Sequence, residues 1–83
     1  MDKVLVDVYV PSIEKSYNIY IPLLCKISII EELISNAIIE LSNYAYQSGN
    51  NPMLCFKDNG KELDKEKTPY DLKIDNGTRL III

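Results

Sequence analysis

The stretch "GKELDKEKTPYDLKIDNGTRLIII", residues 60–83, contains the clearest turn and strand signals in this sequence. It begins at a polar turn and continues through a charged loop and a Thr-Pro-Tyr-Asp segment to an Asp-Asn-Gly turn, which is followed by an apolar run. Asn-Gly pairs next to apolar runs are typical of tight turns between strands. The stretch therefore predicts a long surface crossing over residues 61–73 and a last strand at "TRLIII", residues 78–83.

Two earlier segments alternate between core and surface positions, as strands do. In "KVLVDVYV", residues 3–10, Asp7 belongs in water, so the four valines face the core and Leu5 and Tyr9 share the outer face. Pro11–Lys15 predicts a hairpin loop. In "SYNIYIPLL", residues 16–24, Asn18 sets the outward parity together with Tyr20, and Pro22 ends the strand or places it at an edge.

A helix is predicted between these strands and residue 49. Ser28-x-x-Glu31 matches a capping box, and Gly49 is the expected left-handed cap at the other end. Ile39 lies outside the apolar stripe. One broad apolar face is expected to cover the sheet, made of Ile30, Leu33, Ile34, Ala37, Ile38, Leu41, Tyr44 and Ala45.

The predicted order is strand, strand, helix, a short third strand at "MLCFK" (residues 53–57), short elements and a final strand. A helix with one apolar face must return over the same sheet, and crossover connections are right-handed. We therefore expect one domain over residues 1–83 with an α+β, β-grasp fold, in which a mixed sheet of four to five strands packs on one helix. The last strand lies between the first and the third.

Composition excludes several classes of function. Nine Lys and Arg are spread among twelve Asp and Glu, so no basic stripe favours nucleic-acid binding. The most apolar segment, residues 27–45, carries three glutamates, which argues against membrane insertion, and no signal peptide is visible. We expect a cytoplasmic protein.

Catalysis and cofactor binding are also disfavoured. The chain has no His, and Cys25 and Cys55 alone supply too few ligands for zinc, so we expect two apolar thiols and no metal or cofactor. The acidic residues 62, 64 and 66 alternate with lysines, which is typical of a solvated loop. No catalytic residue is predicted, and we expect a protein that is not an enzyme.

The opening stretch resembles the segment that follows the third strand of ubiquitin-fold proteins. The resemblance is carried by Gly60, Lys61, Leu63, Thr68, Asp71, Leu72 and Ile74, followed by Gly77, Leu80 and Ile82. Among these proteins the chain is most similar to the YukD/EsaB type of Gram-positive type VII (WXG100) secretion systems, which have an (Asn/Asp)-Gly-x-x-Leu segment and an aliphatic strand, as Asn76-Gly77-Thr78-Arg79-Leu80 provides here. That resemblance implies a cytosolic accessory or regulatory subunit that acts by binding. A stand-alone β-grasp adaptor, or a toxin–antitoxin or other regulatory protein with an unrelated α+β fold, remains an alternative.

The sequence departs from conjugated ubiquitin relatives and sulfur carriers at "LIII", residues 80–83. Those proteins extend to a flexible Gly-Gly carboxylate that threads an activating enzyme. Consecutive β-branched residues favour a strand, so we expect no activation, conjugation or sulfur transfer here.

The outer face of the predicted sheet is the candidate protein-binding site. If Leu80 and Ile82 face the helix, residues of opposite parity point outward and could form a continuous apolar area of roughly several hundred square ångströms. The same region is the main recognition surface of ubiquitin. The expected partner is a cytosolic domain of a membrane secretion subunit, either the ATPase or its pseudokinase-like companion, and a homodimer through this face or an edge strand is the alternative. The candidate residues are Leu5, Tyr9, Tyr20, Cys55, Ile81 and Ile83.

Overall fold

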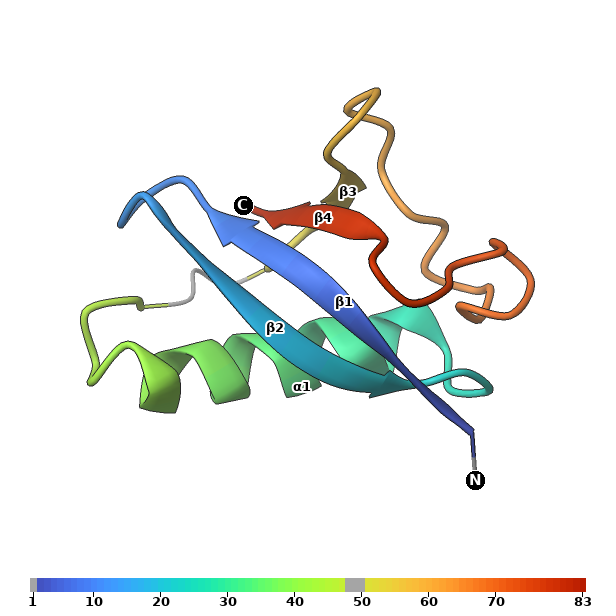
Figure 1. The fold of residues 1–83 in the computed structure, drawn as a ribbon, viewed down its shortest axis with the longest axis horizontal. Helices are drawn as coiled ribbons and strands as arrows, with labels where there is room; N and C mark the ends of the chain where they lie inside the picture. The colour runs from blue at the N-terminus through green and yellow to red at the C-terminus, as the bar shows by residue number, and fades with distance from the viewer. Residues whose placement is uncertain (1, 48–50) are drawn as a thin grey trace.

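The computed structural model describes residues 2–47 and 51–83, which form a sheet covered by one helix (Figure 1). In chain order the elements are β1 (Lys3–Val10), β2 (Lys15–Pro22), α1 (Ile27–Leu41), β3 (Leu54–Phe56) and β4 (Arg79–Ile82). The strand order is β2-β1-β4-β3, with β1 and β4 parallel and the other neighbours antiparallel. The predicted element order, the mixed sheet and the central place of the last strand are confirmed.

The alternation predicted for β1 and β2 is also confirmed. The four valines of β1 are buried, while Leu5, Asp7 and Tyr9 are only partly covered. On β2, Asn18 and Tyr20 are exposed. The inner face of the sheet packs on α1, and the shared core is made of Val4, Val6, Val8, Val10, Ile21, Ile27, Ile30, Ile34, Ile38, Tyr46, Leu54, Leu63, Ile74, Leu80 and Ile82.

The chain turns at Asp58-Asn59-Gly60 and again at Asp75-Asn76-Gly77, and each turn places its glycine in the left-handed region, at φ +72° for Gly60 and φ +90° for Gly77. Between them, Thr68 and Asp71 cap each other. The Thr68 amide donates to Asp71 Oδ2 at 3.2 Å, and the Asp71 amide donates to Thr68 Oγ1 at 3.1 Å. Ile74 closes the core from this side, as its place in the motif predicts.

The predicted capping box at the start of α1 is wrong. The cap residue is Lys26, which makes no side-chain capping bond, and Ser28 already lies within the helix. The first amides are satisfied from a distant loop instead: Ile27 N–H donates to the Lys67 carbonyl at 2.9 Å and Ser28 N–H to the Lys65 carbonyl at 3.2 Å. Glu31 is therefore free for a different role.

The predicted width of the buried helix face is also wrong. Leu33 and Leu41 are 48% and 58% exposed, whereas Ile27, Ile34 and Ile38 are fully buried. Tyr44 is exposed too, because Asn43 and Tyr44 adopt left-handed φ values of 55° and 67° that turn the chain away after the helix ends. The same turn leaves Ala45 exposed. The predicted cap at Gly49 lies outside the described residues.

Residues 61–63 extend the sheet beyond β3 without forming a named strand. The Phe56 amide donates to the Lys61 carbonyl at 2.8 Å, and the Leu63 amide donates to the Leu54 carbonyl at 2.9 Å. Cys55 and Glu62 form the bridge between them. In the part of the chain that the structure describes, no helix has both the length and the apolar character that a membrane crossing requires.

Candidate protein-binding surface

The outer face of the sheet presents an apolar row that crosses three strands. Tyr9 of β1 is the register partner of Ile81 of β4, and Ile81 is the partner of Cys55 of β3. These three residues share one face because each has the parity opposite to the buried Val8, Leu80 and Leu54. Half-buried Tyr9 and Ile81 are thus brought together as the sequence predicts.

Leu5 and Tyr20 form a second, smaller apolar pair. They are register partners on β1 and β2, and Tyr20 is 66% exposed. The backbone of Leu5 is held on its other side by the turn before β4: its amide donates to Asn76 Oδ1 at 2.8 Å and its carbonyl accepts from Gly77 N–H at 2.9 Å. This pair is therefore fixed in place at one end of the sheet.

A polar row separates the two apolar groups. Asp7 pairs in register with Asn18 on one side and with Arg79 on the other. Lys57 follows on the far side of Arg79, and its amide donates to the Arg79 carbonyl at 3.0 Å. The expected continuous apolar area is therefore wrong, because this charged row crosses the sheet between Leu5 and Tyr9.

The basic members of the polar row lean over the apolar row and towards the rim. Lys57 Nζ lies 4.8 Å from the centroid of the Tyr9 ring, within the range of a cation–π contact. Arg79 Nη2 donates to Asp58 Oδ1 at 2.7 Å, in an ion pair whose two side chains are both well exposed. The candidate surface is thus an aromatic and aliphatic row with cations along one side.

Cys55 is not an exposed member of this surface. The expectation that it lies open on the outer face is wrong, because Glu62 pairs along the free side of β3 and the Cys55 side chain is buried. Burial, followed by the negative charges of Glu62 and Glu31, raises the pKa of the Cys55 thiol above its ordinary value. The thiol therefore stays protonated at neutral pH and packs as a small apolar side chain.

Ile83 lies beyond the end of β4 and is 66% exposed. Its backbone is nevertheless paired: the Ile83 amide donates to the Met53 carbonyl at 2.9 Å, and the Met53 amide donates to the Ile83 carbonyl at 3.2 Å. The exposed side chain is therefore presented by an ordered backbone at one end of the apolar row.

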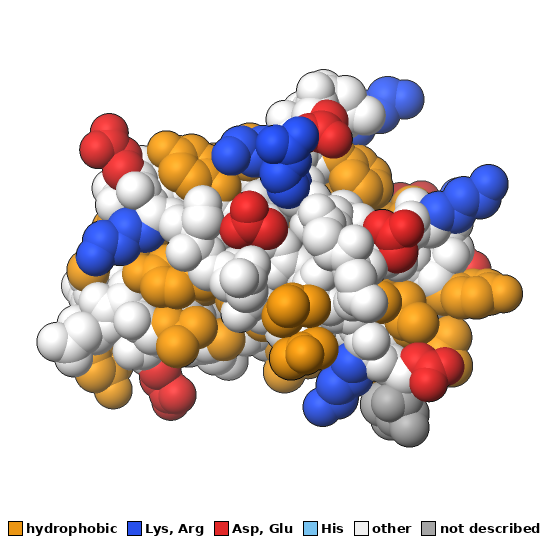
Figure 2. All heavy atoms as spheres, viewed as in Figure 1, with side chains coloured by type: hydrophobic (Ala, Val, Ile, Leu, Met, Phe, Trp, Pro, Cys, Tyr) orange, Lys and Arg blue, Asp and Glu red, His pale blue; other side chains and the backbone are white. Residues whose placement is uncertain are grey.

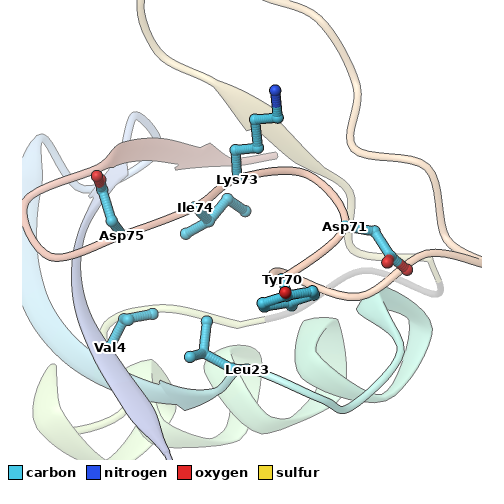
Figure 3. Close-up of a pocket in the computed structure, with 7 residues that line it drawn as sticks. All are labelled: Val4, Leu23, Tyr70, Asp71, Lys73, Ile74 and Asp75. Atoms are coloured by element: carbon cyan, nitrogen blue, oxygen red, sulfur yellow. The ribbon is translucent and has the colours of Figure 1, made fainter.

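A separate cavity of about 600 Å³ opens near the start of β1, between Leu23 and the turn that precedes β4 (Figure 3). Val4, Leu23, Ile74 and the ring of Tyr70 supply its apolar walls, while Lys73 points away from its centre. Asp71 and Asp75 also border it, and both carboxylates accept hydrogen bonds from neighbouring turns. The apolar walls of the cavity can receive an apolar side chain.

A buried carboxylate, Glu31, and a partly exposed ammonium, Lys65, form an ion pair on the other side of the molecule, where α1 approaches β3. Glu31 Oε2 accepts from the Leu54 amide at 3.2 Å and Glu31 Oε1 from Lys65 Nζ at 2.7 Å, so both carboxylate oxygens are used in holding the fold. The hydrogen bond to Glu31 raises the pKa of Lys65 above its ordinary value. Within residues 2–47 and 51–83, no three His, Cys, Asp or Glu side chains are grouped to hold a metal ion.

Sequence reasoning missed the polar row, although its signal was present. The alternation that points Leu5 and Tyr9 outward also points Asp7 outward, and the parity that exposes Ile81 exposes Arg79 two residues earlier. The missing piece was the register between β1 and β4, which sets Asp7 beside Arg79. Residue types alone do not supply that register.

No family model matches this chain, and no curated protein matches it. Solved structures do match over its whole length. The EccD5 ubiquitin-like domain from Mycobacterium xenopi has a TM-score of 0.77 at 17% identity, with 100% of this chain and 94% of that chain covered. The ubiquitin-like domain of the Mycobacterium tuberculosis type VII secretion system protein EccD1 has a TM-score of 0.77 at 10% identity, with 100% and 99% covered.

The fold also occurs as a part of larger assemblies. The MycP5-free ESX-5 inner membrane complex contains a chain that matches with a TM-score of 0.76 at 17% identity, and this protein covers only 21% of that chain. A component of the toluene 4-monooxygenase HD complex matches with a TM-score of 0.80 at 5% identity, with 98% and 96% covered. At such identities likeness shows the fold and no activity. The fold of this chain is a ubiquitin-like β-grasp.

Proposed function

We propose that this chain is a non-conjugated ubiquitin-like protein that serves as a cytosolic accessory or regulatory subunit of a type VII secretion system. It acts by binding another protein and not as an enzyme. The observation that carries the proposal is the full-length fold likeness to the ubiquitin-like domain of a type VII secretion system protein. The Asn76-Gly77-Thr78-Arg79-Leu80 segment with its aliphatic strand, which resembles the small YukD/EsaB-type proteins, supports it.

The outer face of the sheet is the binding site in this proposal. Tyr9 is the anchor at the centre of the contact and Ile81 packs beside it, since a few central residues, often Tyr, carry most of the binding energy of an interface. Lys57 and Arg79 border them and select a partner surface that carries carboxylates. The partner is a cytosolic domain of a membrane subunit of the secretion machine.

Secretion by the native host tests the function. A strain that lacks the gene is complemented with the wild-type chain, and the amount of a small WXG100 substrate in the medium is measured by immunoblotting. We expect loss of secretion on deletion and recovery on complementation. Full secretion by the deletion strain would contradict the proposed function and favour a stand-alone adaptor.

Two variants test the site separately from the function. The Tyr9→Ser/Ile81→Ser pair removes the centre of the outer face, and Tyr70→Ser is the matched control because Tyr70 is 67% exposed away from that row. We expect the pair to lower secretion and the control to leave it unchanged, with both proteins folded by circular dichroism. Normal secretion by the pair would move the site elsewhere while leaving the function in place.

A homodimer through the outer face is the alternative occupant. Light scattering on the purified chain measures the molar mass, and Ile81→Asp places a charge in the middle of the row. If the wild type is a dimer and this variant a monomer, the outer face is a seam between copies. A monomeric wild type supports a different protein as the partner.

A further inference from the structure

An apolar ridge runs along the exposed flank of α1, on the other layer from the outer sheet face. It consists of Ile29, Leu33, Ala37 and Leu41, which follow one another at four-residue steps and so lie in one line along the helix. The three large side chains are each about half exposed, and Ala37 between them is partly buried. We refer to these four residues as the α1 ridge.

The α1 ridge lies on the β2 side of the helix. Glu31 marks the opposite flank, because its carboxylate reaches the amide of Leu54 in β3. β2 is the edge strand of the sheet, and its inward residues Tyr17 and Ile19 are only partly buried. The ridge and these two side chains therefore border the same side of the molecule. Figure 1 places α1 along the lower half of the view with β2 crossing it, and Figure 2 shows hydrophobic side chains there as well as in the upper half.

Every charged side chain of α1 itself is acidic, and Lys26, just before the helix, is paired with Glu66 at 3.4 Å. Glu32, Asn36 and Glu40 form the adjacent line of the helix, also at four-residue steps, and all three are exposed. Neither of these glutamates takes part in an ion pair among the described residues. The sequence has no Lys or Arg between Lys26 and Lys57, so nothing on this helix balances them.

We propose that the α1 ridge docks an amphipathic helix of a partner protein, with aliphatic residues against the ridge and Lys or Arg residues against Glu32 and Glu40. A line of side chains at four-residue steps is the surface that packs into the groove of a second helix. The small side chain of Ala37 lets the two axes approach at the centre. Opposite charges along the rim then fix the orientation of the incoming helix.

The same charges disfavour two other occupants. An anionic membrane surface would be repelled by the acidic line, and membrane-binding helices carry basic residues on their polar face instead. A second copy docked ridge to ridge with the two helices antiparallel would place glutamates opposite glutamates, which weakens association. The inference goes beyond the proposed function: the ridge lies on a different surface from the outer face, and it does not depend on secretion.

A pair of synthetic peptides tests the charge and the site together. Each is an amphipathic helix about five turns long with the same Leu and Ala positions. One carries Lys at its polar positions and the other Glu. In a titration followed by amide chemical shifts of the full chain, we expect the Lys peptide to bind at least about tenfold more tightly, a difference of about 1.4 kcal/mol. Its shifts should map to residues 29–41.

Variants of the full chain make the test decisive. Leu33→Asp should weaken binding of the Lys peptide by about tenfold or more, and Glu40→Lys should weaken the Lys peptide while strengthening the Glu peptide. Tyr20→Asp is the control, because it adds the same charge at an exposed aromatic residue on the outer face of the sheet, opposite the helix layer. Both changed α1 side chains are solvent-exposed, so the fold is retained and the amide spectrum verifies it.

Three results would overturn the proposal. Equal binding of the two peptides would remove the charge argument. Shifts confined to Ser16, Asn18 and Tyr20 would indicate addition of a strand to the edge of β2 instead. A dimer that becomes a monomer on Leu33→Asp would make a second copy the occupant. Loss of the outer-face site, or of any role in secretion, leaves the inference untouched.

Discussion

Two serines on the helix side of the molecule have opposite environments. The Ser35 hydroxyl is buried in α1 and has no hydrogen-bond partner among the described residues. The Ser42 hydroxyl donates to the Ile39 carbonyl at 3.3 Å and accepts from the Tyr46 amide at 3.0 Å, so it closes the end of the helix. One residue type thus has a cost at one position and a benefit at the other.

The same substitution at these serines should change stability in opposite directions. Ser35→Ala removes an unpaired buried hydroxyl and adds the best helix former, so we expect the free energy of unfolding to rise by about 1 kcal/mol. Ser42→Ala leaves the Tyr46 amide without its acceptor and should lower it by about 1 kcal/mol. Urea denaturation measures both. A lower stability for Ser35→Ala would show that the hydroxyl is satisfied.

The two thiols should react at different rates. Cys55 is buried and the pKa of its thiol is raised, whereas Cys25 is only half-buried. Because the thiolate is the reactive form, iodoacetamide at pH 8 should modify Cys25 first and Cys55 only as the chain opens. Peptide mass spectrometry over time measures the two rates, with the urea-unfolded chain as the control in which the rates converge. Equal rates in the folded chain would contradict burial of Cys55.

At the level of the elements, the start of α1 depends on a segment far away in sequence. The carbonyls of Lys65 and Lys67 accept from the first helix amides, and Lys65 also binds the Glu31 carboxylate. Glu31 in turn receives the Leu54 amide of β3. One carboxylate therefore ties the helix, the third strand and the charged loop into a unit.

Changes at Glu31 should report how this tie works. Glu31→Ala leaves the Leu54 amide buried without an acceptor, and we expect a loss of about 2 kcal/mol in the free energy of unfolding. Glu31→Gln keeps an oxygen in the same place and should cost clearly less. Glu32→Ala, at the exposed neighbour, is the matched control and should change stability by less than about 0.5 kcal/mol. Equal losses for the Ala and Gln variants would show that only the negative charge matters.

The sequence predicted the strands better than the helix for a physical reason. Asp7 and Asn18 each show which face of their strand is exposed to solvent, so the inward and outward positions follow directly from the alternation. In α1, aliphatic residues occur on every side, and periodicity could not separate buried Ile34 from exposed Leu33. The predicted capping box of Ser28 and Glu31 does not form because the Lys65 and Lys67 carbonyls accept from the first helix amides, while Glu31 accepts from the Leu54 amide. These partners are distant in the chain, so the local sequence does not reveal them. The candidate site was predicted only in part for the same reason. The register between β1 and β4 and the pairing of Glu62 that covers Cys55 are tertiary contacts, which residue types alone do not reveal.

For the whole molecule, two titratable groups make the free energy of unfolding vary with pH in the alkaline range. The pKa values of the Cys55 thiol and of the Lys65 ammonium are both raised in the fold, above ordinary values of 9.0 and 10.5. As pH rises past those ordinary values, the unfolded chain releases protons that the folded chain retains. The stabilisation that these two groups provide should therefore be fully present below about pH 9 and decline above it.

Denaturant titrations between pH 8 and pH 11 measure this decline. Cys55→Ala should remove its earlier part and Lys65→Met its later part, because each variant lacks one of the two protons. Lys67→Met is the matched control, since Lys67 takes part in the helix cap only through its backbone carbonyl. A wild-type profile that stays flat or rises over this range would contradict the raised pKa values.

The central strand pair of the sheet joins two segments that are far apart along the chain, since β1 at Asp7 lies beside β4 at Arg79. The β1–β2 hairpin and the helix can begin to form from local contacts, but the middle of the sheet must wait until this large loop closes. Refolding should therefore be slow for so small a protein, on a timescale of milliseconds or longer. Until β4 arrives, β1 lacks one of its two neighbouring strands, and in that interval the chain is most exposed to aggregation and to chaperones.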